Sequence, residues 1–460
     1  MKIFFSRKKI ILVVSILLFF AGILFLFSLA KTNKKLIGIA SLSAVNRFSA
    51  FLPISDDEKK ELEVVNNLVQ AFTRKDDKER AFLIFLQNNM ELRPGGGFLG
   101  QYAIVKMKNG EVTSTFFEDA NLLDQRITAK ITPPYPFKRM MQIKKWKFRD
   151  SNFSPDFPTN VEKAKYFYRL SGRGGNFDGF AAVNADVFND ILALTGPITV
   201  PGYNKTFKSP DGALDLEEYV EKYYLMNPDV YSQNRKNIMK TMAPIIIKKL
   251  FSLGNVSKVA ELVHQEFQNK NIMVNFTDPS LQSQIESVYW GGEVSRTWES
   301  DYLMIVDANM GSLKTDYYIK REISYNIDLT AEKPIATLNI LYKNTAPYGD
   351  WRTSDYHSYL RVYVPKGSNL LERQMVSYPN LGEEFGKTYF GFICHVVIGQ
   401  ETNAMIKYEL PENFSKDNYR LLVQKQSGVG NIPVKVHVKS RTGEFDQEQT
   451  LNDSLKFELQ

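Results

Sequence analysis

The chain has 460 residues, of which 43% are hydrophobic and 24% charged, a composition that excludes a disordered protein and predicts two or three domains. Its net charge of +7 does not indicate a nucleic-acid-binding protein, because the first 55 residues hold eight Lys and Arg and no acid, which leaves −1 for the rest. The single cysteine, Cys394, excludes an intrachain disulfide and a cysteine metal cluster.

Residues 10–30 are uncharged and almost wholly apolar, so they are long enough to cross a membrane as a helix. The apolar region of a cleaved signal peptide is normally shorter, which favours a retained anchor. Slightly more basic residues precede this segment than follow it, which favours a cytoplasmic N-terminus. We therefore expect a single-pass plasma-membrane protein with residues 1–35 as cytoplasmic tip and anchor and with the C-terminal body outside.

Residues 36–79 are predicted to form a stalk and a capping helix, because apolar residues recur at helical spacing over 56–72. Helices and strands then alternate over residues 80–298, which predicts an α/β domain. Its expected strands are 81–86, 102–108, 112–117, 177–183 and 198–201, and its expected helices are 159–168, 186–194, 216–224 and 235–251. Asn109-Gly110 suits a type I′ hairpin turn, and Thr159 with Glu162 has the spacing of a capping box.

Residues 299–460 show strand patterns without a convincing helix, which predicts a β-sandwich that folds as a separate domain. The expected strands are 317–329, 336–342, 359–364, 389–397, 404–410, 420–424 and 434–438. The predicted fold is therefore an α+β multidomain protein: a transmembrane helix, an α/β domain and a C-terminal β-sandwich.

The stretch LQNNMELRPGGGFLG (residues 86–100) follows the first buried strand and holds the candidate binding site. Gly95, Gly96 and Gly97 permit either a tight turn or close approach of a ligand to the main chain. Arg93 beside exposed backbone N–H groups suits phosphate or carboxylate oxygens, and we expect it to form the wall of an anion site. The alternative is that the glycines form a structural turn and that Arg93 pairs with Glu91.

A second polar cluster, Arg149-Asp150-Ser151-Asn152, precedes the helix predicted from residue 159. Arg149 and Asn152 are candidate substrate-binding residues, although Arg149 with Asp150 is also a plausible ion pair and Asp156 is more simply a helix cap. Asp119 and Asp150 are candidate Mg²⁺ ligands and catalytic bases, because Mg²⁺ prefers oxygen ligands and phosphate partners. The histidines lie away from these clusters, which argues against serine-histidine hydrolysis and histidine zinc sites.

LQNNMELRPGGGFLGQYAIVKMKNGEV, RDSNFSPDFP and FDGFAAVNADVFNDILALTGPITV together resemble a family of bacterial envelope proteins of unknown function, the domain of unknown function numbered four thousand and twelve. The chain is more distantly similar to the LytR-CpsA-Psr phosphotransferases, with Asp229 and Arg235 on matching positions. This chain has Glu221-Lys222-Tyr223 where those proteins have an arginine pair that holds pyrophosphate. It also has Ser232 and Lys236 at two further matched positions, and Glu118-Asp119 where they carry Arg-Asp.

Two functions therefore remain open. The first is a metal-assisted phosphotransferase, or a binder of a polyprenyl-phosphate-linked glycan, in which Arg93, Arg149 and Arg235 hold phosphate. The second is a non-enzymatic envelope module that binds glycan or protein through its β-sandwich. The missing arginines favour the second function. The polar residues beside Gly95, Gly96 and Gly97 favour the first.

Overall fold

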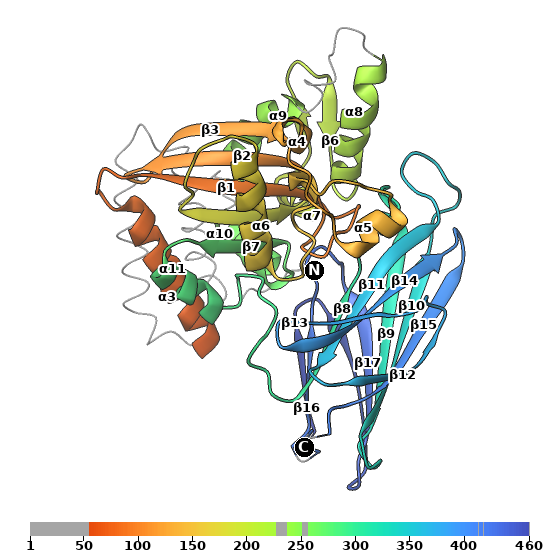
Figure 1. The fold of residues 1–460 in the computed structure, drawn as a ribbon. Coiled ribbons are helices and arrows are strands. Elements are labelled where there is room, and N and C mark those ends of the chain that lie inside the picture. The colour runs from red at the N-terminus through yellow and green to blue at the C-terminus, as the bar shows by residue number, and fades with distance from the viewer. Residues whose placement is uncertain (1–54, 227–236, 251–255, 413, 417, 460) are drawn as a thin grey trace, which may run out of the picture. The chain divides into compact units, whose positions relative to one another are not determined.

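The computed structural model describes residues 55–226, 237–250, 256–412, 414–416 and 418–459 (Figure 1). The predicted anchor at residues 10–30 lies outside them, and none of the helices in the described part is long and apolar enough to cross a membrane. The chain divides into two compact units of three segments each. Unit 1 comprises the chain up to Gln87, Gly100–Arg126 and Ser171–Gly291, and unit 2 comprises Asn88–Leu99, Ile127–Leu170 and Gly292–Gln460.

This division differs from the two consecutive domains expected at 80–298 and 299–460. Residues 88–99 and 127–170 were assigned to the α/β domain from their place in the sequence, but they belong to the unit that contains the sandwich. Their contacts are with residues far along the chain, which local sequence patterns do not report.

Unit 1 is built on a five-stranded mixed sheet in the order β3-β2-β1-β4-β7. β1 and β4 run parallel, whereas β2 with β3 and β4 with β7 are antiparallel. The strands are β1 (Glu79–Asn88), β2 (Phe98–Lys108), β3 (Glu111–Asp119), β4 (Gly179–Asn184) and β7 (Ile272–Phe276), and a separate hairpin joins β5 (Ile198–Val200) to β6 (Lys205–Phe207). The turn between β2 and β3 has positive φ at both Asn109 and Gly110, as the sequence predicted.

The unit 1 helices are α3 (Asp56–Thr73), α4 (Ala120–Arg126), α7 (Asp186–Thr195), α8 (Gly212–Met226), α9 (Asn237–Leu250), α10 (Val256–Gln268) and α11 (Pro279–Ser287). The apolar stripe predicted for α3 is buried, and it packs with residues of the sheet, α10 and α11 in one core. In this core the Phe72 and Phe82 rings meet edge to face at 5.2 Å. Burying such side chains stabilises the fold by about 1.5–3 kcal/mol each.

Unit 2 contains two six-stranded sheets that share one apolar core, which makes it a β-sandwich. One sheet has the order β12 (Asn369–Gln374), β15 (Glu401–Glu409), β10 (Ile335–Asn344), β9 (Ile319–Asp328), β17 (Ile432–Lys439) and β18 (Glu444–Leu451). The other has the order β13 (Asn380–Glu384), β14 (Lys387–Val396), β11 (Tyr356–Pro365), β8 (Asp301–Val306), β16 (Arg420–Gln424) and β19 (Leu455–Glu458). All seven predicted strands are present.

Unit 2 also contains the helices α5 (Tyr135–Met140) and α6 (Phe157–Leu170) and the 3₁₀ turns η2 (Phe148–Asp150) and η4 (Thr315–Tyr318). The capping box predicted at Thr159 and Glu162 is wrong, because α6 begins two residues earlier. Asp156 caps it instead, since its carboxylate accepts the Thr159 N–H at 3.2 Å. The same carboxylate accepts the Val294 N–H and pairs with Arg296, both at 3.0 Å, so it also fixes the chain that leads into β8.

Candidate functional site

The glycine loop, residues 88–99, follows β1 and belongs to unit 2. Two of its glycine N–H groups are bonded to protein acceptors: the Gly95 N–H donates to the Asn152 carbonyl at 3.0 Å and the Gly96 N–H to the Arg93 carbonyl at 2.9 Å. The Asn152 amide returns a hydrogen bond to the Gly97 carbonyl at 2.6 Å. These donors are therefore not available to a bound anion.

The glycines at 95 and 97 are required because other groups of unit 2, some of them in the loop itself, approach them closely. A Cβ at Gly97 would overlap the main chain of Asn88 and Asn89, and one at Gly95 would overlap the Asn160 side chain. Gly96 has a φ of 125°, a conformation that favours glycine. The structural turn, the alternative that the sequence left open, thus accounts for all three glycines.

Arg93 is buried, with only 1% of its surface exposed. Its guanidinium donates to the Glu91 carboxylate and to the Asn309 carbonyl, both at 2.8 Å, and its Nε lies 3.6 Å from Asp150 Oδ1. The guanidinium therefore faces protein groups and not solvent, contrary to the expected wall of an anion site. This is the geometry of an ion-pair partner.

The electrostatics of this charge cluster oppose an anionic ligand. Glu91 and Asp150 are both buried, so two carboxyl groups face a single guanidinium. Burial raises the pKa of the Glu91 carboxyl, although the charge of Arg93 opposes this rise. A phosphate placed here would meet two carboxyl groups and a cation that is already paired.

The other predicted site residues are divided between the units. Asp119 lies in unit 1, at the end of β3, where its carboxylate accepts the Asn121 N–H at 2.9 Å at the start of α4. Asp150 lies in unit 2 together with Asn152 and the half-buried Arg149. Arg235 lies outside the described residues.

The expected Mg²⁺ role of Asp119 or Asp150 stays a prediction. Asp119 and Asp150 do not share a unit. Within the ranges that the structure covers, there is also no group of three His, Cys, Asp or Glu side chains that could hold a metal ion. Asp119 acts in its own unit as a turn residue, and Asp150 acts in its unit as a partner of Arg93.

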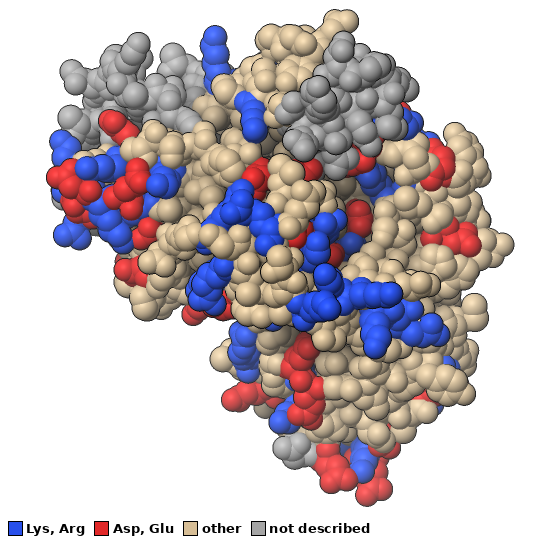
Figure 2. Space-filling model, turned by 45° about the horizontal axis from the view of Figure 1, so that its top comes forward, with Lys and Arg blue, Asp and Glu red and all other residues tan. Residues whose placement is uncertain are grey.

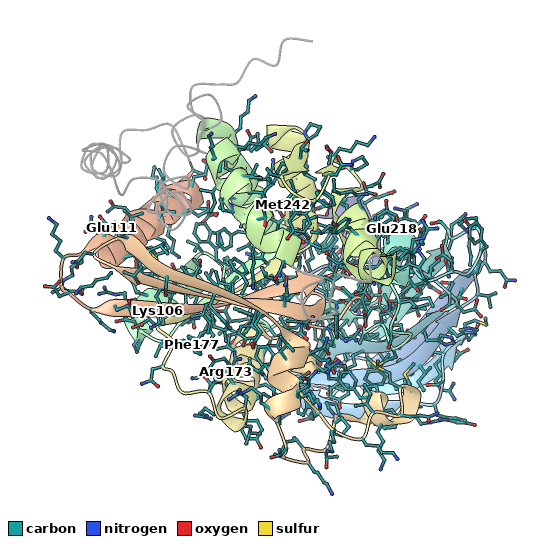
Figure 3. All side chains as sticks on the ribbon, turned by 90° about the horizontal axis from the view of Figure 1, so that it is seen from above. Lys106, Glu111, Arg173, Phe177, Glu218 and Met242 are labelled. Carbon is teal, nitrogen blue, oxygen red and sulfur yellow. The ribbon has the colours of Figure 1, made fainter. Side chains whose placement is uncertain are left out.

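Sequence reasoning missed a partly buried ion pair in unit 1, between Arg173 and Glu118. Arg173, in the segment before β4 (Figure 3), pairs with the Glu118 carboxylate at 2.6 Å and contacts the Tyr102 hydroxyl, which also bonds to Glu118. About a fifth of the Arg173 side chain, 21%, is exposed. Arg173 lies in the glycine-rich stretch SGRGG, 55 residues from Glu118 in sequence, so no local pattern indicated the pairing.

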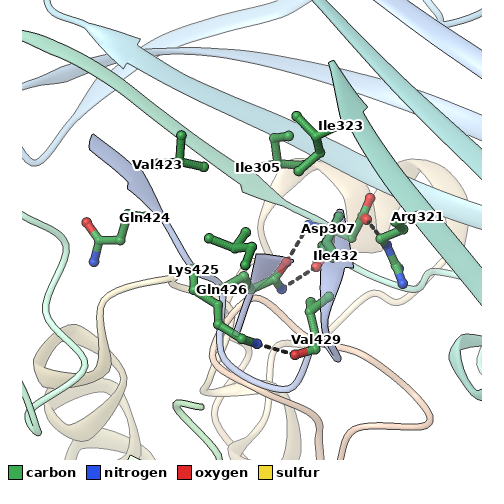
Figure 4. Close-up of a pocket in the computed structure, with 11 residues that line it drawn as sticks. Ile305, Asp307, Arg321, Ile323, Val423, Gln424, Lys425, Gln426, Val429 and Ile432 are labelled. Carbon is green, nitrogen blue, oxygen red and sulfur yellow. Dashed lines mark hydrogen bonds and ion pairs between the residues drawn. The ribbon is translucent and has the colours of Figure 1, made fainter. Parts of the chain in front are cut away.

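A buried polar network continues from the glycine loop into the sandwich. Arg321 pairs with Asp307 and Asp316 at 2.8 Å each, and Asp316 accepts the Leu92 N–H at 3.1 Å. The adjoining cavity, of about 20 Å³, is lined by Gln426 and Arg321 among others (Figure 4). It has room for one water molecule and excludes a sugar, so this network is structural.

Residues 77–209 match the model of a family described as protein of unknown function (DUF4012). The resemblance found in the sequence is confirmed. The DUF4012 match runs from the start of β1 to the loop after β6, and so includes segments of both units. A comparison with curated proteins gave no match.

Several solved structures are also similar to the DUF4012-matching chain. The protein gbs0355 of Streptococcus agalactiae is 15% identical, with 48% of this chain and 76% of that chain covered and a TM-score of 0.29. TagV of B. subtilis is 14% identical, with 47% and 82% covered and a TM-score of 0.26. Lin1025 of Listeria innocua is 16% identical, with 46% and 80% covered and a TM-score of 0.25. TM-scores below 0.5 carry no argument about the activity of this chain.

Proposed function

We propose that this protein is a cell-envelope protein that binds a glycan through its β-sandwich unit and does not transfer it. The observation that carries this proposal is the charge cluster of Glu91, Arg93 and Asp150. Phosphoryl transfer depends on cations that face the transferred group, and Arg93, one of the three arginines expected to do so, is buried against carboxylates. The segment at residues 10–30 would anchor the protein, with both units on the outer face.

Exposed aromatic side chains in unit 2 support glycan binding. Tyr378, Tyr348 and Tyr135 are exposed by 86%, 61% and 47%. A tyrosine ring offers an apolar face to the C–H groups of a sugar and a hydroxyl to its polar groups. Tyr378 is further held by Arg373, whose guanidinium lies 4.4 Å from the ring centroid.

A second candidate function, transfer of a phosphate group, rests on the Arg173–Glu118 ion pair of unit 1. Arg173 and Glu118 are only partly buried, and Asp119 follows Glu118 directly. An arginine beside carboxylates is a combination that phosphotransfer can use. It is the weaker proposal, because Arg173 is paired with Glu118 and the described carboxylates do not form a metal site.

The experiment that separates these functions uses the full chain in detergent with Mg²⁺ and a polyprenyl-pyrophosphate-linked glycan. We expect the protein to retain the glycan without releasing polyprenyl phosphate, which is the product that transfer of the glycan phosphate must leave. Release of polyprenyl phosphate that is lost in Arg173→Ala and in Asp119→Asn would contradict the binding function and favour the second candidate.

A further inference from the structure

Residues 127–149 in unit 2 carry seven Lys and Arg and no Asp or Glu. Five of these side chains are exposed, and we refer to them as the basic surface: Lys130, Lys138, Arg139, Lys144 and Lys145. Figure 2 shows Lys and Arg side chains together on part of one face, with few Asp and Glu side chains between them. The net charge of −1 for the rest of the chain conceals this segment.

Some other exposed lysines of unit 2 have acidic partners, whereas the basic surface has none among the described residues. Lys333, Lys343 and Lys366 pair with glutamates at 2.7, 2.7 and 3.2 Å. None of the five residues of the basic surface forms an ion pair with any residue that the structure describes. Five unpaired cations side by side in sequence repel one another, and an anionic partner relieves that repulsion.

The segment that carries the basic surface is anchored at several points. Phe137, in the first turns of α5, is fully buried against Phe153 at a ring distance of 4.7 Å and belongs to a core with Met310 and Tyr359 of the sandwich. The Trp146 main-chain N–H donates to the Ile131 carbonyl at 2.7 Å, which closes the segment on itself. The cations are therefore presented on an ordered scaffold and not on a free tail.

Aromatic rings lie within and beside the same segment. Tyr135 is 47% exposed at the start of α5. Lys163 of α6 lies 4.5 Å from the Trp146 ring and 5.4 Å from the Tyr166 ring. Rings that stack on sugars and ammonium groups that pair with phosphates are together suited to a polymer that alternates the two.

We propose that the basic surface binds a glycan polymer whose units are joined by phosphodiesters. This inference rests on the proposed glycan binding and names the ligand class and the place on unit 2. Four of the five cations are lysines, which contact phosphates as point charges without fixed bidentate geometry. That suits a flexible polymer better than a single phosphate group held in one orientation.

The test measures binding of the full chain to a glycosylated poly(glycerol phosphate) polymer by calorimetry. The test variant is Lys144→Glu with Lys145→Glu. The matched control is Lys320→Glu with Lys439→Glu, two exposed lysines on β9 and β17 that change the net charge equally. We expect the test variant to bind at least about tenfold more weakly and the control to bind within about twofold of the unaltered protein. Raising the salt concentration from about 50 to about 200 mM should weaken binding roughly 10- to 100-fold if about four phosphates are contacted.

Equal losses in the two variants would overturn the proposal, because net charge would then explain binding. Equal affinity for single-stranded DNA of the same charge, or for vesicles of anionic phospholipid, would also overturn it, because sugar rings would contribute nothing. Release of polyprenyl phosphate in the transfer experiment would contradict the proposed function and leave this charge comparison standing. Binding of the polymer that neither variant changes would also overturn the proposal, because the glycan would then bind elsewhere.

Discussion

Asp301 is a fully buried carboxyl group in the sandwich core, at the first residue of β8. Its Oδ2 accepts the hydroxyls of Tyr419 and Tyr325 at 2.6 and 2.7 Å, and its Oδ1 accepts the Tyr302 N–H at 2.8 Å. Burial nevertheless raises the pKa of Asp301 to about 6, so desolvation outweighs the three hydrogen bonds.

The raised pKa of Asp301 predicts that unit 2 becomes less stable as the pH rises. The folded state binds this proton more tightly than the unfolded state, so the stabilisation is complete below pH 3.8 and is lost as the pH rises through about 6. This shift in the pKa of Asp301 corresponds to about 3 kcal/mol in the free energy of unfolding. Urea unfolding between pH 4.5 and 7.5 should show this decline, and Asp301→Asn should flatten it. An unchanged slope in Asp301→Asn would show that another group is responsible.

At the scale of an element, the glycine loop acts as an insertion into the sandwich. Leu92 is 1% exposed and belongs to the sandwich core, and the Gln426 amide donates to the Arg93 carbonyl at 3.2 Å. The loop therefore links the end of β1 to the core of unit 2 through main-chain and apolar contacts. A ligand is not needed to explain its composition.

This role predicts different effects of the same substitution at two glycines. Gly97→Ala should lower the free energy of unfolding by about 1–3 kcal/mol, because its Cβ would overlap the main chain of Asn88 and Asn89. Gly174→Ala should change it by less than about 0.5 kcal/mol, because no atom lies within 4 Å of its Cβ position. Denaturant unfolding of the two variants tests the prediction. Equal stability would mean that the loop is not tightly packed.

Sequence patterns predicted the elements better than the contacts between elements. The helical spacing of apolar residues located α3, and the positive φ angles suited to Asn109-Gly110 located the β2–β3 turn. The burial of Arg93 could not be predicted, because its partner Asn309 is more than two hundred residues away. The polarity of the loop therefore suggested a ligand site, although its polar groups form hydrogen bonds and ion pairs with other protein groups.

At the scale of the whole molecule, each unit depends on segments that the chain supplies out of order. The sandwich unit takes 88–99 and 127–170 from within the first half of the sequence. The DUF4012 match, residues 77–209, contains both segments but not the sandwich strands. The matched region therefore contains segments of both units and does not coincide with either one.

We expect a fragment of residues 301–460 to be markedly less stable than a fragment of 77–460. It lacks Leu92 from the sandwich core, and it lacks Phe137 and Phe153, which pack on Met310 and Tyr359. Losing such buried contacts should lower the melting temperature of the sandwich by roughly 10–20 °C or abolish its cooperative transition. Calorimetry of both fragments tests this. A cooperative transition of 301–460 at the temperature of the longer fragment would support the consecutive domain boundary that the sequence indicated.

The central claim is that Arg93 holds the fold together and does not hold phosphate. The most direct measurement determines both the free energy of unfolding and the affinity for a polyprenyl pyrophosphate in Arg93→Ala and Arg93→Lys. Removing the guanidinium leaves the carboxyl groups of Glu91 and Asp150 buried and uncompensated, so we predict a loss of about 3–5 kcal/mol for Arg93→Ala and a smaller loss for Arg93→Lys. The affinity of the folded protein should stay within about twofold. Unchanged stability with a ten- to hundredfold loss of affinity would contradict the claim and assign Arg93 to the ligand.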